Sequence, residues 1–282
     1  MNPFQKFVSE SARVFQSGKI LPLGLKNRPR PVASRKTSDV LIFSPHPDDD
    51  CITGALALRL LLEAKWNVVN VAVTLGSKKE RHAARLRELK NACDCLRFDL
   101  IVAGLEKINL ETRNKNRAQW KSAVQTIAEI LAAKKPRVIF LPHENDGHPA
   151  HVGTHFLVLD ALKKLPRGFE CFAVETEFWA QMANPNLLVE SGVEDVADLI
   201  AALAFHVGEV KRNPYHARLP AWMMDNVRRG SELVCGAGAS PPDFTFGTVF
   251  RLQKWSGGKI QKVFKDGKFL SAKENPASLF GD

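Results

Sequence analysis

The chain has 282 residues, of which 45% are hydrophobic, and a formal net charge of +10. This length and composition predict one large hydrophobic core, with room for a small appendage but without a second complete domain. Five cysteines, an odd number, argue against a disulfide framework, and no apolar run approaches the length of about 20 residues that spans a membrane, so we expect a cytoplasmic protein without a membrane span.

The first 37 residues are expected to form a basic extension. Residues 1–17 are predicted to form a short amphipathic helix, and Arg28, Arg30, Arg35 and Lys36 follow among prolines. Basic residues then continue to Lys273, interleaved with acids, and do not form one concentrated patch. The net charge of +10 leaves a non-catalytic polyanion-binding protein open as an alternative, but the spread of the charge argues against it, and we expect no nucleic-acid partner.

Apolar, β-branched runs alternate with helical windows along the next part of the chain. The runs lie near residues 40, 70, 138 and 172, and the windows span about residues 52–64, 79–97, 117–134 and 152–164. This alternation is typical of βαβ units and predicts a mainly parallel α/β sheet with flanking helices over residues 38–185.

The first polar cluster, at residues 46–50, follows the apolar run at residues 40–43 and reads His-Pro-Asp-Asp-Asp. An imidazole and a nearby carboxylate suit Zn²⁺ or a related ion, and a second carboxylate can take a proton from water. The same residues also suit a turn in which an aspartate caps the following helix. Alone, this segment fits a turn as well as a metal site.

The second polar cluster, at residues 143–151, reads His-Glu-Asn-Asp-Gly-His-Pro-Ala-His and also follows an apolar run. Five of the eight histidines of the chain lie in this cluster, in the first one, or at His155. Because parallel strands all end at one edge of a sheet, the two clusters can meet there despite about a hundred intervening residues. Together they predict a metal site with three protein ligands.

Residues 186–282 are predicted to form a C-terminal part. From about residue 240 the pattern changes to two apolar, β-branched segments at residues 244–252 and 259–264, separated by Gly257 and Gly258. This pattern indicates a terminal hairpin, a small β element that covers or edges the core.

The two polar clusters together resemble the signatures of the PIG-L/LmbE-like family of zinc-dependent N-acetylglucosaminyl deacetylases, a His-Pro-Asp-Asp-Glu loop and a later His-Pro-Asp-His loop. Here they correspond to residues 46–50 and 148–151, and the similarity extends over about residues 39–177. The resemblance implies a Rossmann-like metal hydrolase. Residues 186–282 would complete the site of this hydrolase.

Carried over residue by residue, the resemblance implies that His46, Asp49 and His151 bind Zn²⁺ or another divalent ion such as Fe²⁺. It makes Asp48 the general base and His148 the electrostatic or general-acid partner of the reacting carbonyl.

Three positions near these residues bear on the resemblance. Asp146 matches a frequent acidic position and is expected to contact the substrate. Asp50 replaces the usual Glu, a change that we expect to be harmless. Ala150 replaces the usual Asp and removes a carboxylate that would favour the imidazolium form of His148.

Further residues are candidates for binding substrate. Arg85 matches a substrate-contacting Arg of the family, although a solvated helix face is the alternative. Residues 213–222 contain Tyr215 and His216 between two prolines, and the prolines predict a loop. This loop either recognises a sugar or only connects two elements. Glu175 and Glu177 end a strand and are either site acids or solvated residues.

We therefore expect an enzyme that removes the N-acetyl group of an N-acetylglucosamine-type sugar or sugar conjugate by metal-activated water. A metal-dependent amidase that acts on a larger amide conjugate is the alternative within the same chemistry. The sequence predicts a small-molecule partner, but neither the exact substrate nor the oligomeric state.

Overall fold

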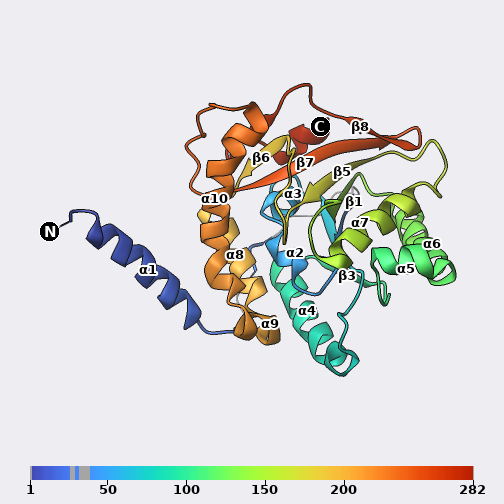
Figure 1. Cartoon of the computed structure of the whole chain (residues 1–282), viewed down its shortest axis with the longest axis horizontal. Helices are drawn as coiled ribbons and strands as arrows, with labels where there is room; N and C mark the ends of the chain where they lie inside the picture. Colours follow the sequence, from blue (N-terminus) through green and yellow to red (C-terminus); the bar gives the residue numbers. More distant parts are fainter. Residues whose placement is uncertain (1, 26–28, 32–38, 282) are drawn as a thin grey trace.

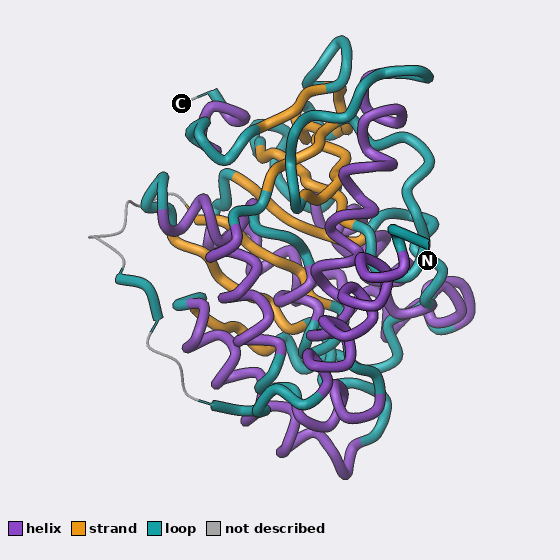
Figure 2. The backbone as a smooth tube through the Cα atoms, turned by 90° about the vertical axis from the view of Figure 1, so that its left-hand side faces the viewer, coloured by secondary structure: helices purple, strands orange, loops and turns teal. Residues whose placement is uncertain are grey.

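The computed structural model describes residues 2–25, 29–31 and 39–281, which Figure 1 and Figure 2 show in two views. The helices are α1 (Gln5–Lys19), α2 (Asp49–Ile52), α3 (Leu56–Leu62), α4 (His82–Leu96), α5 (Leu110–Lys115), α6 (Arg117–Lys134), α7 (Pro149–Leu162), α8 (Val193–Leu203), α9 (Val207–Arg212) and α10 (Tyr215–Cys235). The strands are β1 (Asp39–Ser44), β2 (Asn67–Ala72), β3 (Asp99–Val102), β4 (Val138–Pro142), β5 (Cys171–Thr176), β6 (Leu187–Glu190), β7 (Gly247–Ser256), β8 (Lys259–Lys262) and β9 (Lys268–Leu270). Short 3₁₀ helices cover Lys79–Arg81 and Pro276–Phe280.

The strands form one mixed sheet in the order β3-β2-β1-β4-β5-β7-β6-β9, and β8 pairs with β7. The first five strands are parallel, because helical connections return the chain to the same end of the sheet each time. Strand β7 enters antiparallel between β5 and β6. The predicted α/β fold with a mainly parallel sheet and flanking helices is therefore confirmed.

The order of the strands reverses between β1 and β4, which are neighbours although β2 and β3 lie between them in sequence. In open α/β sheets, ligands bind in the crevice at the carboxyl ends of the two strands that flank such a switch point. The polar cluster at residues 46–50 follows β1, and the cluster at residues 143–151 follows β4.

Each face of the sheet carries its own hydrophobic core. In β1, Val40 and Ile42 belong to one core and Leu41 and Phe43 to the other, because successive side chains of a strand point to opposite faces. Helices α3, α4, α8 and α10 supply side chains to the first core, and α6 and α7 to the second. Figure 2 shows the strands running between these helices.

The predicted helical windows agree with the structure for α4, α6 and α7, whereas the window at residues 52–64 is divided into α2 and α3. The break lies at Gly54, whose φ of +83° is unfavourable for residues with a side chain. A Cβ atom at Gly54 would also lie 2.4 Å from Thr248 Oγ1 of β7. The break therefore allows the close approach of β7.

The expectation that prolines interrupt residues 213–222 is wrong, because α10 begins at Tyr215 and continues through Pro220. Pro214 precedes the first turn, where its missing N–H costs no helical bond. Pro220 removes one bond inside the helix, but Leu219 and Met223 beside it are buried in the core. Tertiary packing therefore outweighs the local preference.

Both ends of the chain agree with their predicted elements. The amphipathic helix predicted at residues 1–17 is α1, and the hairpin predicted after residue 240 is formed by β7 and β8 around Gly257 and Gly258. The predicted basic residues Arg28, Arg35 and Lys36 lie outside the described residues. Among the residues that are described, no helix has both the length and the apolar character needed to cross a membrane.

Candidate metal centre and cleft

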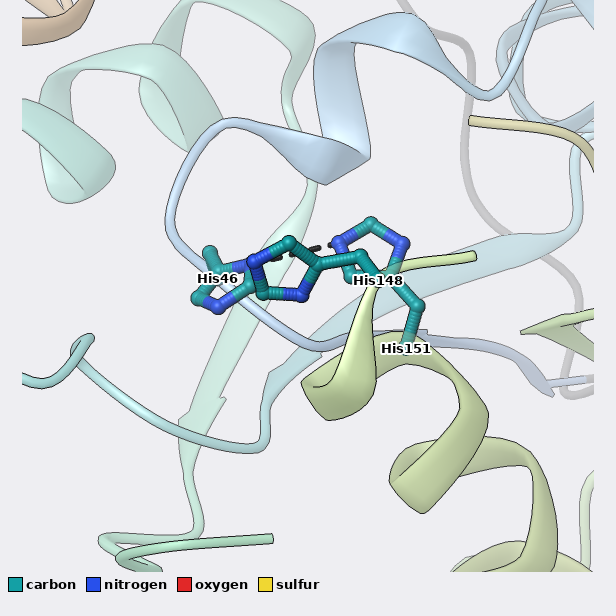
Figure 3. Close-up of side chains that lie close together, drawn as sticks. All are labelled: His46, His148 and His151. Carbon is teal, nitrogen blue, oxygen red and sulfur yellow. Dashed lines mark hydrogen bonds between the residues drawn. The ribbon is translucent and has the colours of Figure 1, made fainter. Parts of the chain in front are cut away.

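The structure brings the two polar clusters together at the carboxyl ends of β1 and β4. His46 lies in the loop after β1, and Asp49 begins α2. His148 caps the N-terminus of α7, and His151 lies in its first turn. Figure 3 shows the three imidazoles facing one another, although about a hundred residues separate His46 from the other two.

His46, Asp49 and His151 form a triangle of potential metal ligands. His46 Nδ1 lies 3.2 Å from His151 Nε2, and Asp49 Oδ2 lies 3.4 Å from each of these nitrogens. Two ligand atoms held about 2.05 Å from a tetrahedral zinc ion are about 3.3 Å apart. The three atoms therefore fit a single divalent ion without rearrangement, and His46 and Asp49 also line the adjacent cleft.

A second grouping of three ligands would use His148 in place of Asp49, since one ring nitrogen of each of the three histidines lies within 4.8 Å of the others. Asp49 fits better, because both of its distances match the tetrahedral spacing. In addition, His148 Nδ1 already accepts a hydrogen bond from the backbone N–H of Ala150, at 3.2 Å. The structure thus favours the predicted trio, with His148 beside it.

His148 lies in the cleft, and its Nδ1 carries no proton because it accepts the backbone N–H of Ala150. Burial lowers its pKa, and the neighbouring rings of His46 and His151 lower it further. Because Nδ1 accepts the N–H of Ala150, the proton of the neutral ring sits on Nε2, which is then a hydrogen-bond donor. The ring stacks on Trp179 with 5.8 Å between centroids. The backbone N–H of residue 150 is present with any side chain except proline, and Ala150 leaves the ring without the carboxylate that is usual in the family signature.

Asp146 lies behind His151 and does not line the cleft. Its Oδ1 is 3.1 Å from His151 Nδ1, and its Oδ2 accepts the backbone N–H groups of Phe178 at 3.0 Å and Trp179 at 3.2 Å. Both Asp146 and His151 are fully buried. A carboxylate behind a histidine fixes the tautomer and orientation of the ring, and here it directs Nε2 toward His46 and Asp49. The position of Asp146 gives no support to the predicted substrate contact.

Asp48 is a buried carboxylate at the wall of the cleft. Burial and the neighbouring Asp49 raise the pKa of Asp48 well above its usual value, and Arg85 opposes this effect. Burial also acts to raise the pKa of Asp49, but His151 and His46 outweigh it and lower that pKa to about 2. The two adjacent carboxylates are therefore electrostatically distinct, and Asp48 binds a proton more readily.

Arg85 points into the cleft and does not lie on a solvated helix face. Its Nη2 is 3.3 Å from Asp48 Oδ1 and 3.9 Å from Glu209 Oε1 of α9. Gly76 makes this position possible, because a Cβ atom there would lie 2.3 Å from Arg85 Nη1. Glu209 also pairs with Arg81 and Arg212, so a network of charges surrounds Asp48.

The cleft has a volume of about 700 Å³ and is lined by charged and aromatic side chains. Seven lining residues are basic and four are acidic, which makes the wall positive: Lys78, Lys79, Arg81, Arg85, Lys107, Arg212 and Arg218 against Asp48, Asp49, Glu106 and Glu209. The aromatic wall contains Trp179, Tyr215 and Trp222. The predicted Tyr215 is thus part of the cleft, whereas His216 is buried outside it, and its position does not support substrate binding.

Several cleft residues were missed by sequence reasoning, notably Trp179, Glu209 and Arg212. Glu209 and Arg212 lie in the short helix α9, where no local motif marks them. Trp222 ends the segment at residues 213–222 that was predicted to recognise a sugar, and it lines the cleft. For Trp179, its place two residues after Glu177 was a usable signal.

Glu175 and Glu177 are neither solvated nor in the cleft. Glu175 pairs with Arg251, its partner across the β5–β7 ladder, and Arg251 also binds Glu144 of the second cluster. Glu177 accepts a hydrogen bond from Arg229 Nη1 at 3.2 Å. Buried ion pairs thus hold the loops around the candidate site in place, and the reading of these acids as solvated strand-end residues is wrong.

Asp50 and its cysteine neighbours lie beneath the candidate site. Cys51 Sγ is 3.8 Å from Asp50 Oδ1, and Cys93 Sγ is 3.6 Å from Asp50 Oδ2. Burial, followed by the charge of Asp49, raises the pKa of Asp50 to about 7. Because it is buried and bonded in this way, Asp50 supports the loop and offers no atom to the cleft.

Comparisons with known proteins agree with the resemblance of the two signatures. Residues 41–162, less than half of the chain, match the family described as "PIG-L: GlcNAc-PI de-N-acetylase", and the predicted resemblance is confirmed for this part. No curated protein sequence matches the chain.

Three similar solved structures illustrate how the fold is used. The N,N'-diacetylchitobiose deacetylase of Pyrococcus horikoshii is 16% identical with a TM-score of 0.57, over 91% of this chain and 96% of that one. The teicoplanin deacetylase Orf2, in a zinc-inhibited form, is 14% identical with a TM-score of 0.58, over 77% and 98%. GalB, the 4-carboxy-2-hydroxymuconate hydratase of Pseudomonas putida KT2440, is 14% identical with a TM-score of 0.57, over 76% and 95%. At these identities the likeness establishes the fold alone.

Proposed function

Because residues 41–162 carry a PIG-L family domain, we propose that the protein is a metal-dependent deacetylase. Its substrate would be an N-acetylglucosamine-type sugar or sugar conjugate, and its products acetate and a free amine. The main support comes from the triangle of His46, Asp49 and His151, whose spacing suits one divalent ion at the wall of a cleft.

The three ligands would hold Zn²⁺ or Fe²⁺, which supplies an activated water and polarises the acetyl oxygen. Asp48 is the carboxylate beside this position that can take the proton of the attacking water and return it to the leaving amine. Arg85 holds Asp48 through an ion pair and so fixes the orientation of the base.

His148 supplies the second catalytic group. Its Nε2–H donates a hydrogen bond to the acetyl oxygen as negative charge develops there, an effect worth about 3 kcal/mol for one well-placed donor. A neutral imidazole is sufficient for this role, since the bond from Ala150 to Nδ1 already places the proton on Nε2. The loss of the usual aspartate at position 150 is therefore compatible with catalysis.

The cleft favours an anionic sugar conjugate over a free acetamido sugar. Its volume of about 700 Å³ is in the range that holds drug-sized ligands, which are larger than one sugar ring. Trp179 and Tyr215 offer aromatic faces and edges to a sugar, and Arg85 offers a planar set of donors to a hydroxyl or phosphate. The excess of basic residues in the lining adds attraction for a negative group.

The test is acetate release by the purified protein, reloaded with either Zn²⁺ or Fe²⁺ at no more than one ion per chain. This limit matters because one similar structure is described as a zinc-inhibited form. The panel contains N-acetylglucosamine, its phosphate, an N-acetylated disaccharide and a nucleotide sugar. Acetate should be released fastest from a negatively charged member of the panel.

Two substitutions connect the reaction to the site. Asp48→Asn should lower kcat by about 10²–10⁴-fold because it removes the base, and His151→Ala should remove both tight metal binding and activity. Asp160→Asn, in α7 but paired with Arg113 away from the cleft, is the matched control and should retain activity.

Activity that survives both Asp48→Asn and His151→Ala would contradict the assignment. Since GalB shows that a hydratase shares this fold, acetate itself must be measured. Metal-dependent water addition without acetate release would replace the proposed function by a hydratase.

A further inference from the structure

Helix α1 presents an apolar face that the rest of the described chain leaves exposed. Phe4, Phe7, Val8 and Val14 lie on one side at helical spacing, and between 62% and 70% of each side chain is exposed. Lys6, Ser9, Arg13 and Gln16 lie on the opposite side. No residue within α1 is buried. Figure 1 shows this helix projecting from the body, in blue.

The C-terminal end of α1 is the part that is attached to the body. Phe15 stacks under the guanidinium of Arg218 in α10, which lies 4.9 Å from the ring centroid. Gly18 packs closely on α10, where an added Cβ atom would lie 3.0 Å from that of Ala217. The attachment therefore holds one end of the helix and leaves the apolar face of its first three turns uncovered.

The segment that contains α1 carries most of the net positive charge of the chain. Residues 1–38 contain eight lysines or arginines and one acid, Glu10, so seven of the ten net positive charges lie in this segment. Arg30 pairs with Asp195 and Asp198 of α8 and ties the segment to the body at a second point. The apolar face of α1 thus lies at the periphery of the molecule, in the part of the sequence that carries this net charge.

We propose that α1 docks the protein on the surface of an anionic lipid bilayer. A helix with phenylalanine on one face and lysine or arginine on the other lies in the plane of the interface, with its apolar face among the acyl chains. Negatively charged headgroups attract the basic residues of the segment. The helix does not need to cross the bilayer for this.

Charge distinguishes a bilayer from the other possible occupants of this face. Two copies of a segment with seven net positive charges would repel each other, so pairing of α1 with a second copy is disfavoured. A nucleic acid would use the positive charge but would leave Phe4, Phe7 and Val14 exposed. An anionic bilayer satisfies both the apolar face and the charge.

Docking would place the cleft next to the bilayer. Arg218, which anchors Phe15 of α1, also lines the cleft, as do Tyr215 and Trp222 on the same helix. The C-terminal end of α1 therefore contacts the same turns of α10 that form one wall of the cleft. The proposal does not depend on the reaction in the cleft, because vesicle binding is measured without substrate.

The test is flotation of the full-length protein with vesicles of phosphatidylcholine alone and of phosphatidylcholine mixed equally with phosphatidylglycerol. We expect binding to the mixed vesicles, weaker binding to neutral vesicles, and loss of binding as salt is raised. Phe7→Ser combined with Val14→Ser should weaken binding to the mixed vesicles by at least about tenfold, because both side chains leave water when α1 docks.

The matched control replaces two exposed apolar residues of the body, Val193→Ser and Met224→Ser, which are 73% and 54% exposed. This control should bind like the unchanged protein. Equal binding of the α1 variant and the unchanged protein, or no binding to mixed vesicles at low salt, would overturn the proposal. Concentration-dependent dimerisation that needs Phe7 and Val14, without vesicle binding, would overturn it in favour of a second copy.

Discussion

Asp146→Asn provides a sharp test of how the candidate metal centre is held together. The carboxylate of Asp146 accepts two backbone N–H groups at 3.0 and 3.2 Å and lies 3.1 Å from His151 Nδ1. If the asparagine turned its NH₂ group toward the two backbone N–H groups, these buried donors would have no acceptor. The cost would be about 1–3 kcal/mol for each N–H group. The asparagine should therefore keep its oxygen toward the backbone and its NH₂ toward His151.

This orientation forces His151 into the wrong tautomer. An NH₂ group facing Nδ1 requires Nδ1 to accept, so the proton moves to Nε2, the atom that faces His46 and Asp49. Zinc affinity should fall by about 10–100-fold. That loss corresponds to about 1.4–2.8 kcal/mol of binding free energy.

The assay is competition for Zn²⁺ between the metal-free protein and a chromophoric chelator, with thermal unfolding of each metal-free protein as the check on folding. Asp160→Asn is again the control, because it makes the same chemical change in a carboxylate at the far end of α7. A folded Asp146→Asn protein that binds zinc as tightly as the unchanged one would refute the reasoning.

Three further results are expected. Gly76→Ala should lower kcat/KM several-fold in steady-state assays, because its Cβ atom would meet Arg85 Nη1 at 2.3 Å and φ is +89°. Trp179→Ala should raise KM by about tenfold, through the loss of an aromatic wall that stacks on His148. Burial lowers the pKa of His155 to about 4. Between about pH 4 and 6.5 the unfolded chain therefore binds more protons than the folded chain. The free energy of unfolding should fall by up to about 3 kcal/mol through this group as the pH falls through that window. Urea unfolding at several pH values should show a smaller acid loss for His155→Gln, which keeps a donor for Pro142 O, and an unchanged loss would contradict this assignment.

The position of the candidate site was predictable because two strong local signals and one topological rule coincide. Polar clusters directly after apolar runs indicated strand ends, and parallel strands place those ends at one edge. The spacing of His46, Asp49 and His151 in the structure is what this rule leads one to expect of a metal centre. Nothing local in the sequence, in contrast, linked Asp146 to His151, since a residue behind a ligand has no motif of its own.

The parts that were missed depend on long-range packing. Strands β3 and β6 are four residues long, too short for a periodic pattern to be read. Glu209 reaches the cleft from α9, whose position is decided by the fold as a whole. No motif marks Arg229 in the sequence, yet it is 8% exposed and pairs with Glu177. Pro220 shows the same competition, in which buried neighbours outweigh a local preference.

The ion pairs of Arg251 have a consequence for the chain while it is being synthesised. Arg251 lies on β7 and bridges Glu175 and Glu144, which were synthesised long before it. Until this residue leaves the ribosome, the nascent chain carries two acids without their cation and an open β5 edge that can pair wrongly. A stalled or truncated translation product that ends before β7 is therefore a target for chaperones and proteases, even though both signatures have already been made.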